Sequence, residues 1–197
     1  MIVNYPVYYY CIDDFNDVGF GCSYRNAQTI LSSYKNNYKD TINIPRIQDM
    51  LQYFNSDYKE KLKESKKTAL WIEPYQISEY LKKNFQIQGK NILYVTQDQD
   101  IERIMKTDIS IYIESKVYNH NNFSELIELI SNHFANSKLP IVIDDGVYSY
   151  CMIYSHDQPD KIILIDPHTQ RNDSSIKIKD ISFIKESFWM IYLPITY

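Results

Sequence analysis

The segment DVGFGCSYRNAQTI, residues 17–30, changes from a loop composition to a helical pattern at its cysteine. The whole chain of 197 residues has only four glycines, and two of them, Gly19 and Gly21, enclose Phe20 directly before Cys22. Apolar side chains then recur at helical spacing, at Ala27, Ile30, Leu31 and Tyr34. This spacing predicts a helix that begins at Cys22 and turns one face toward a core.

Two explanations account for Cys22 at the start of a helix. Unpaired backbone N–H groups and the positive end of the helix dipole stabilise a thiolate there, and the same amides can hold an oxyanion. Gly19 and Gly21 would then leave room for the main chain of a substrate. Alternatively, the glycines form a tight turn and a small residue caps the helix. Both explanations remain open on these residues alone.

The composition indicates a folded protein without a strong charge. Hydrophobic residues make up 44% and aromatic residues 15%, including 19 tyrosines, so a single globular domain over residues 1–197 is expected. The 21 basic and 25 acidic residues give a net charge of −4. That balance argues against nucleic acid as a partner and against binding to a membrane surface.

The cysteine count and the hydropathy pattern indicate a reducing compartment. Three cysteines are too few for a disulfide framework, and none has the spacing of zinc ligands, so we expect neither metal nor cofactor. No apolar run reaches the roughly 18 residues that a membrane span requires. The first eleven residues lack the features of a signal peptide. A cytoplasmic location is therefore expected.

Helical patterns dominate the first two-thirds of the chain and strand patterns the last third. Helices are predicted to begin at Cys22, Pro45 and Pro74 and to span 122–136, and the charged segment 58–68 is expected to be a solvated loop or exposed helical turn. Strands are predicted at 6–12, 91–96, 109–114, 141–144, 147–154, 161–166 and 188–195. The fold class is therefore α+β with an antiparallel sheet.

The remaining cysteines and three of the four histidines have simple structural explanations. Cys11 and Cys151 lie in strand-like apolar runs and are expected to pack in the core. The polar loop around His120, the helix around His133 and the turn around His156 account for these side chains without a catalytic role.

Asp166 and His168 follow a predicted strand in the sequence KIILIDPHTQ. Two residues apart in extended backbone, their side chains leave the same face of the sheet, and Pro167 stiffens the backbone between them. The aspartate could then orient the imidazole and leave its other nitrogen for Cys22. An ordinary turn at the end of a strand explains the same residues equally simply.

The segments YYYCIDDFNDVGFGCSYRNAQTILSSY and KIILIDPHTQ together resemble the ubiquitin-fold-modifier-specific cysteine proteases, which have a papain-like fold. The resemblance continues through IPRIQDML, LWIEPYQISEYL, ILYVT, ELIELISNHFANSKLPIVI, GVYSY and FWMIYLPI, in the same order. It implies a helical part that carries the nucleophile and packs against the antiparallel sheet. It also implies cleavage after the C-terminal glycine of the modifier, which matures the precursor and removes the modifier from conjugates.

By this resemblance, four residues form the catalytic set. Cys22 is the nucleophile, His168 the general base and acid, Asp166 the residue that orients it, and the hydroxyl of Tyr10 helps bind the oxyanion. The residues expected to contact substrate are Gly19, Phe20, Gly21, Gly146 and Tyr150. Trp71 and Trp189 match aromatic positions and are taken as core.

Departures from the family pattern lie around the expected substrate channel. Phe20 replaces a tryptophan, Asp144 and Asp145 replace small residues, Tyr150 and Cys151 replace a histidine and a threonine, and no glycine follows His168 closely. Specificity for the modifier is the property that these changes affect most.

Three alternatives remain beside the proteolytic function on this modifier. They are an inactive relative that binds or scaffolds a ubiquitin-like modifier, a deubiquitinase of the same superfamily, and the autophagy-related proteases. The expected partners are the modifier and its conjugates, with room for a membrane-bound adaptor.

Overall fold

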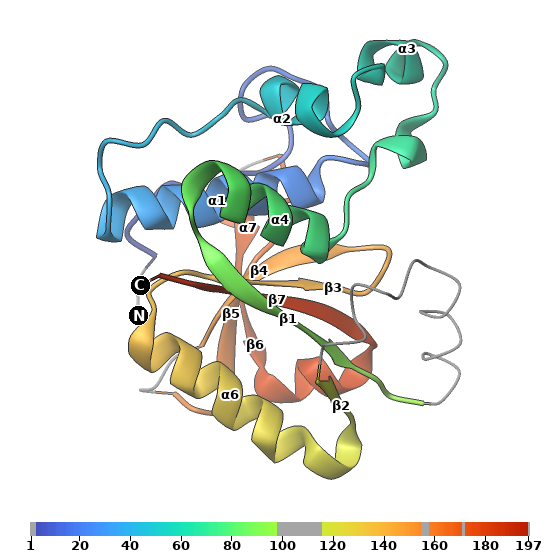
Figure 1. Ribbon diagram of the computed structural model, residues 1–197. Helices are drawn as coiled ribbons and strands as arrows, with labels where there is room; N and C mark the ends of the chain where they lie inside the picture. Colours follow the sequence, from blue (N-terminus) through green and yellow to red (C-terminus); the bar gives the residue numbers. More distant parts are fainter. Residues whose placement is uncertain (1–2, 98–115, 155–157, 171, 197) are drawn as a thin grey trace.

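The computed structural model describes residues 3–97, 116–154, 158–170 and 172–196, without the side chains of 172 and 173. Its centre is a seven-stranded sheet with the strand order β2-β1-β7-β3-β4-β5-β6. Figure 1 shows helices α1 and α4 over one face of this sheet and α6 over the other. The single domain predicted for residues 1–197 stays a prediction, because parts of the chain lie outside the described residues.

The helices follow the predicted pattern closely. The α-helices are α1 (Cys22–Asn37), α2 (Ile47–Phe54), α3 (Tyr58–Lys63), α4 (Pro74–Phe85), α6 (Phe123–Asn136) and α7 (Asn172–Ser175). The 3₁₀ turns are η1 (Lys67–Leu70), η3 (His120–Asn122) and η4 (Ile181–Glu186). Helices α1 and α4 begin at the predicted residues, and α2 and α6 begin within two residues of them. The charged segment forms the short α3 and η1.

The strands are β1 (Gln88–Tyr94), β2 (Val117–Tyr118), β3 (Ile141–Asp144), β4 (Ser149–Tyr154), β5 (Lys161–Ile165), β6 (Ile176–Asp180) and β7 (Trp189–Ile195). Their neighbours pair antiparallel except β1 and β2, which pair parallel. The four strands predicted after Pro140 are confirmed as β3, β4, β5 and β7. Strand β6 was not predicted. Its sequence IKIKD forms an edge strand that is exposed along its length, so it lacks the run of buried apolar residues by which the other strands were recognised. The strand predicted at 109–114 lies outside the described residues.

The strand predicted at 6–12 is wrong. The backbone N–H of Tyr8 donates to the Thr29 hydroxyl of α1 at 3.0 Å, and the N–H of Tyr10 donates to the Pro167 carbonyl at 2.9 Å. This segment therefore crosses between a helix and the end of β5 without joining the sheet. Cys11 lies half-buried in a turn with φ of 61°, so its predicted packing in the core is also wrong.

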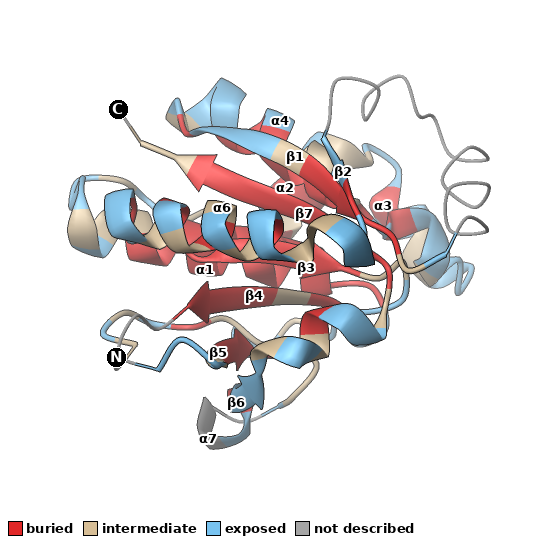
Figure 2. Ribbon diagram, turned by 90° about the horizontal axis from the view of Figure 1, so that it is seen from below, coloured by how far each residue is buried: buried red, intermediate tan, exposed pale blue. Residues whose placement is uncertain are grey.

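The two larger parts of the core lie one on each face of the sheet (Figure 2), and a small third cluster contains Leu93, Val95, Phe188 and Met190. One part lies beneath α1 and α4, and it includes the buried Cys151 as predicted. The other lies beneath α6 and includes Trp189, which confirms the assignment of that residue to the core. The same assignment for Trp71 is wrong, because 44% of this residue is exposed and its indole N–H donates to the Gly19 carbonyl at 2.7 Å.

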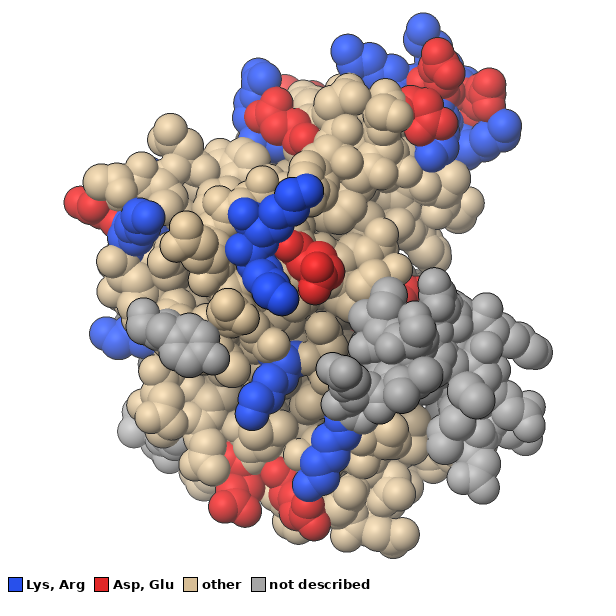
Figure 3. All heavy atoms as spheres, viewed as in Figure 1, with Lys and Arg blue, Asp and Glu red and all other residues tan. Residues whose placement is uncertain are grey.

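In the part of the chain that the structure describes, no helix is both long and apolar enough to cross a bilayer. Acidic and basic side chains are interspersed over the face seen in Figure 3, so this face carries no extended patch of one sign.

Candidate active site

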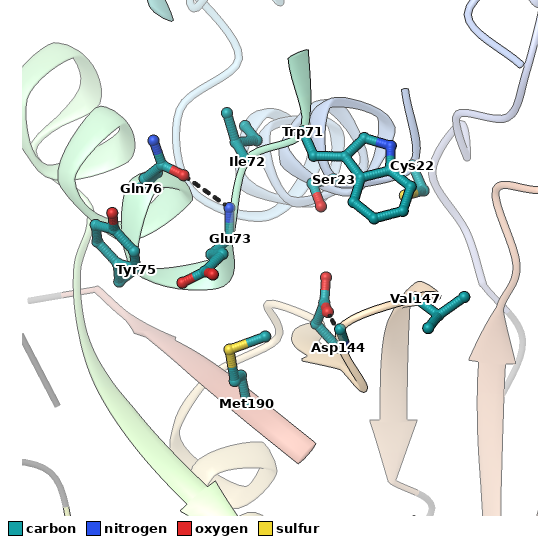
Figure 4. A pocket seen from close by; sticks show the side chains of 11 residues that line it. Cys22, Ser23, Trp71, Ile72, Glu73, Tyr75, Gln76, Asp144, Val147 and Met190 are labelled. Atoms are coloured by element: carbon teal, nitrogen blue, oxygen red, sulfur yellow. Dashed lines mark hydrogen bonds between the residues drawn. The ribbon is translucent and has the colours of Figure 1, made fainter. Parts of the chain in front are cut away.

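Cys22 is the first residue of α1 and lines a pocket of about 190 Å³. The pocket lies where α1, the segment before α4, and the ends of β3 and β7 meet, as Figure 4 shows. Its other lining residues are Ser23, Trp71, Ile72, Glu73, Tyr75, Gln76, Asp144, Gly146, Val147 and Met190. The thiol is 8% exposed, so the nucleophile expected from the sequence faces a small, largely enclosed space.

The two glycines before Cys22 have structural reasons. Gly19 has φ of +89°, a conformation that favours glycine, and its N–H donates to the Tyr10 hydroxyl. A Cβ on Gly21 would lie 2.1 Å from Asp17 Oδ2, so no side chain fits there. The structure thus supports the tight-turn explanation of the glycines. Phe20 is fully buried in the core beneath α1 and does not line the pocket, which corrects its predicted contact with substrate.

A buried ion pair ties this turn to α1. Asp17 accepts from Arg25 Nε at 2.7 Å and from the Cys11 N–H at 2.9 Å. Arg25 also donates to Asp13 at 2.7 Å. Since Arg25 lies one turn after Cys22, the pair links the start of the helix to the segment that carries Tyr10.

Asp166 and His168 are paired as the sequence predicts. The His168 Nδ1 lies 2.7 Å from Asp166 Oδ1, and the His168 backbone N–H donates to the same oxygen at 2.9 Å. Lys177 of β6 donates to the other carboxylate oxygen at 2.5 Å. Burial opposes ionisation of Asp166, but the hydrogen bonds from His168 and Lys177 outweigh it and lower the pKa of this carboxyl to about 2. A permanent carboxylate therefore holds the imidazole.

The other imidazole nitrogen has no partner. His168 Nε2 is buried without a hydrogen bond among the described residues, and tyrosine rings surround the imidazole. Ring centroids lie 5.5 Å away for Tyr10, 5.1 Å for Tyr148 and 5.3 Å for Tyr150. An imidazole nitrogen held in this way without a hydrogen-bond partner is suited to proton transfer.

Tyr10 joins the two halves of the site. The interaction with its hydroxyl lowers the pKa of Cys22, its ring contacts the His168 ring edge-on, and its backbone N–H donates to the Pro167 carbonyl beside His168. Burial, first, and then Cys22 raise the pKa of Tyr10, so the hydroxyl remains a donor at neutral pH. Sequence reasoning without a family gave no signal for this residue, since three tyrosines stand in a row there.

Burial opposes the thiolate that one of the two explanations of Cys22 invokes. Burial and then the Asp144 carboxylate raise the pKa of Cys22 to about 11, while the interactions with Tyr10, Ser23 and Ser149 lower it. Burial therefore outweighs the start of the helix, and the sulfur is a thiol at neutral pH. A base must then remove the proton when the thiol reacts.

Of the two remaining residues predicted to contact substrate, one lines the pocket of Cys22 and the other does not. Gly146 has φ of +86° and lines the pocket with Cys22. Tyr150 contacts the His168 ring and does not line that pocket. Asp144 does line it, and sequence reasoning noted this residue only as a departure from the family. No group of three or more metal-ligating side chains gathers anywhere in the described residues.

A buried cysteine at a helix start and an aspartate–histidine pair after an antiparallel strand, with Tyr10 against the histidine ring, resemble the site of papain-like cysteine peptidases. The profile of Peptidase family C78 matches residues 1–187. The chain belongs to this family. The α+β fold is the one predicted, with Cys22 on the helical part that packs against the sheet.

Two relatives carry the comparison further. The chain is 25% identical over 210 residues to a probable Ufm1-specific protease of Oryza sativa subsp. japonica, covering 97% of the chain and 29% of that protein. The crystal structure of UfSP from C. elegans superposes with a TM-score of 0.63 at 21% identity, covering 96% of the chain and 32% of that structure. The chain therefore spans about a third of the length of the relatives it matches, and the second comparison shows the fold alone.

Proposed function

We propose that the protein is a thiol protease that cleaves after the C-terminal glycine of a Ufm1-type modifier. Maturation of the precursor, release of the modifier from conjugates and a cytoplasmic location belong to the same proposal. The observation that carries it is Tyr10, which contacts Cys22 and the His168 ring together. The name of the rice relative supports the choice of modifier.

The geometry supports a sequence of proton transfers. His168 Nε2 takes the proton of the Cys22 thiol as the sulfur attacks the carbonyl carbon of the terminal glycine. The Tyr10 hydroxyl and the Cys22 backbone N–H hold the oxyanion. The imidazolium gives its proton to the leaving amine, which leaves a thioester. His168 then activates a water that hydrolyses the thioester and restores the thiol.

The pocket fits an extended tail better than a folded surface. Its space of about 190 Å³ takes a few residues of main chain, and a folded modifier would have to remain outside. Trp71 and Val147 line this pocket and are each about half exposed, so they offer an apolar contact to the modifier. Gly146 lines the pocket, so no side chain from this residue narrows the path to the sulfur.

A comparison of activity-based probes tests the proposal. Ufm1, ubiquitin and a third ubiquitin-like modifier would each carry a C-terminal propargyl amide, and labelling would be located by peptide mass spectrometry. We expect labelling at Cys22 by the Ufm1 probe alone, and none in Cys22→Ala. Labelling by ubiquitin alone would assign a deubiquitinase. Binding of Ufm1 without labelling by any probe would assign an inactive binding protein.

Tyr10→Phe is expected to slow cleavage of a Ufm1 fusion by about tenfold to a thousandfold in kcat, with little change in KM. The hydroxyl is lost, but the ring that packs on His168 stays. Steady-state kinetics on a fluorogenic Ufm1 fusion would measure the split. Tyr9→Phe, one residue earlier, is the matched control and should keep full activity. An unchanged kcat in Tyr10→Phe would remove this hydroxyl from the mechanism.

A further inference from the structure

Asp144, the last residue of β3, places a carboxyl group in the pocket of Cys22. The residue is 7% exposed, and Figure 4 shows its side chain pointing from the strand end toward the start of α1. Oδ1 accepts from the Gly146 N–H at 2.7 Å. The Ser149 hydroxyl donates a second hydrogen bond to the carboxylate. The group is therefore fixed in place and largely shielded from water.

Ser149 connects this carboxylate to the nucleophile. The interaction with its backbone lowers the pKa of Cys22, and the interaction with its side chain lowers the pKa of Asp144. Asn26 of α1 donates to the Ser149 Oγ at 2.9 Å, which leaves the hydroxyl hydrogen for the carboxylate. The thiol and the carboxyl group are thus neighbours across one residue of β4.

The charged groups around Cys22 and Asp144 are either acidic or already paired with another carboxylate. Glu73 at the start of α4 lines the same pocket, and Asp145 follows in the turn. Lys177 of β6 binds Asp166. The pocket-lining residues that the structure describes include two carboxylates and no lysine or arginine. Nothing among them offsets a negative charge on Asp144.

Three tyrosines, Tyr10, Tyr24 and Tyr150, also interact electrostatically with Cys22. Burial, first, raises the pKa of each of them, so they are neutral near pH 7. The ring of His168 is held by Asp166 and contacts the rings of Tyr10 and Tyr150. Asp144 is therefore the group on β3 whose charge can change beside Cys22 as the pH passes neutrality.

The direction of that change follows from the burial. Desolvation, first, and then the repulsion from Asp145 and Glu73 raise the pKa of Asp144 to about 7, against the hydrogen bonds from Gly146 and Ser149. Below that pH the group is neutral. Above it the carboxylate is charged and opposes a thiolate on Cys22, whose pKa it raises.

We propose that Asp144 is a positioning residue that adds to burial in holding Cys22 in its thiol form above neutral pH and so shifts the pH dependence of the reactivity of this sulfur. The proposal rests on Cys22 as the nucleophile of the proposed function. In the free enzyme, it makes the sulfur slow to react with electrophiles that do not engage His168. Its physical basis is the repulsion between two negative charges in a buried pocket.

The test is the pH profile of Cys22 alkylation. Iodoacetamide would be applied from pH 6 to 9 and modification at Cys22 followed by peptide mass spectrometry. Asp144→Asn should move the profile to lower pH by about one unit, which is about a tenfold faster alkylation at pH 8. Asp145→Asn is the matched control. It removes the same charge from the next residue, whose carboxylate accepts from Val147 and Tyr148 at 2.8 and 2.7 Å.

The outcomes separate this proposal from the proposed function. An unchanged profile in Asp144→Asn, or an equal shift in both variants, would overturn the proposal. Asp144→Ser, also neutral, gives a second measurement in case Asp144→Asn lowers the melting temperature. Alkylation requires no modifier, so the shift can be observed even if no Ufm1 probe labels Cys22. That combination of results would contradict the proposed function alone.

Discussion

Cys22→Ser and His168→Ala are each expected to reduce cleavage of a Ufm1 fusion by at least about a thousandfold. A serine hydroxyl is a poorer nucleophile than the thiol in the same position. Burial and Asp144 raise the pKa of Cys22 to about 11, so the thiol needs a base, and His168→Ala removes the imidazole that is proposed to take its proton. Release of a fluorescent reporter from the fusion would measure both losses.

Matched controls exist for both substitutions. Cys11→Ser replaces a half-buried cysteine in a turn, and His120→Ala replaces a histidine that bonds the Tyr94 hydroxyl at 3.1 Å on β1. Both should cleave nearly as fast as the unmodified protein. If Cys22→Ser cleaved at the full rate, the nucleophile would have to be sought elsewhere in the chain.

The local parts of the site could be predicted from the sequence. The helix from Cys22 follows from apolar spacing, which acts within a few residues. The pairing of Asp166 with His168 was expected from extended backbone, but Pro167 and His168 lie in a turn after β5. In this turn the backbone N–H and the ring Nδ1 of His168 lie 2.9 and 2.7 Å from Asp166 Oδ1, so the pairing is still local and still follows from residues two apart.

The parts of the fold and of the site that depend on tertiary contacts could not be predicted from the sequence. The tyrosine-rich segment 6–12 has the composition of a strand, but its N–H groups bind Thr29 and Pro167 instead of a strand partner. Tryptophan is a typical core residue, yet Trp71 is half exposed and its indole N–H donates to the Gly19 carbonyl. No local pattern indicates that Asp144 meets Cys22, because more than a hundred residues separate them.

The segment between Tyr10 and Cys22 explains why these distant parts assemble. Tyr10 is bound to the end of β5 through Pro167, and the same segment is bound to α1 through Asp17. Asp17 also accepts from the N–H of Cys11, next to Tyr10. The distance between nucleophile and imidazole therefore depends on a short segment that is attached at both ends. Its attachment to α1 is a buried ion pair.

Asp17→Asn is expected to lower the free energy of unfolding by about 3 kcal/mol. Asp17 and Arg25 are both fully buried, so loss of one charge leaves the guanidinium without one of its two carboxylate partners. Asparagine also turns an amide nitrogen or a neutral oxygen toward Arg25 Nε. Urea unfolding followed by circular dichroism would measure the change.

Asp13→Asn is the matched control for this ion pair. Asp13 binds the same guanidinium at 2.7 Å, but its side chain is 29% exposed, so water can compensate for its loss and the cost should stay below about 1 kcal/mol. Asp17→Asn should also slow Cys22 labelling under conditions where the protein is still folded, because Tyr10 loses its anchor. An equal loss of unfolding free energy in Asp17→Asn and Asp13→Asn would contradict this prediction. It would show that the buried ion pair stabilises the protein no more than the exposed one, and that packing alone holds the segment between Tyr10 and Cys22.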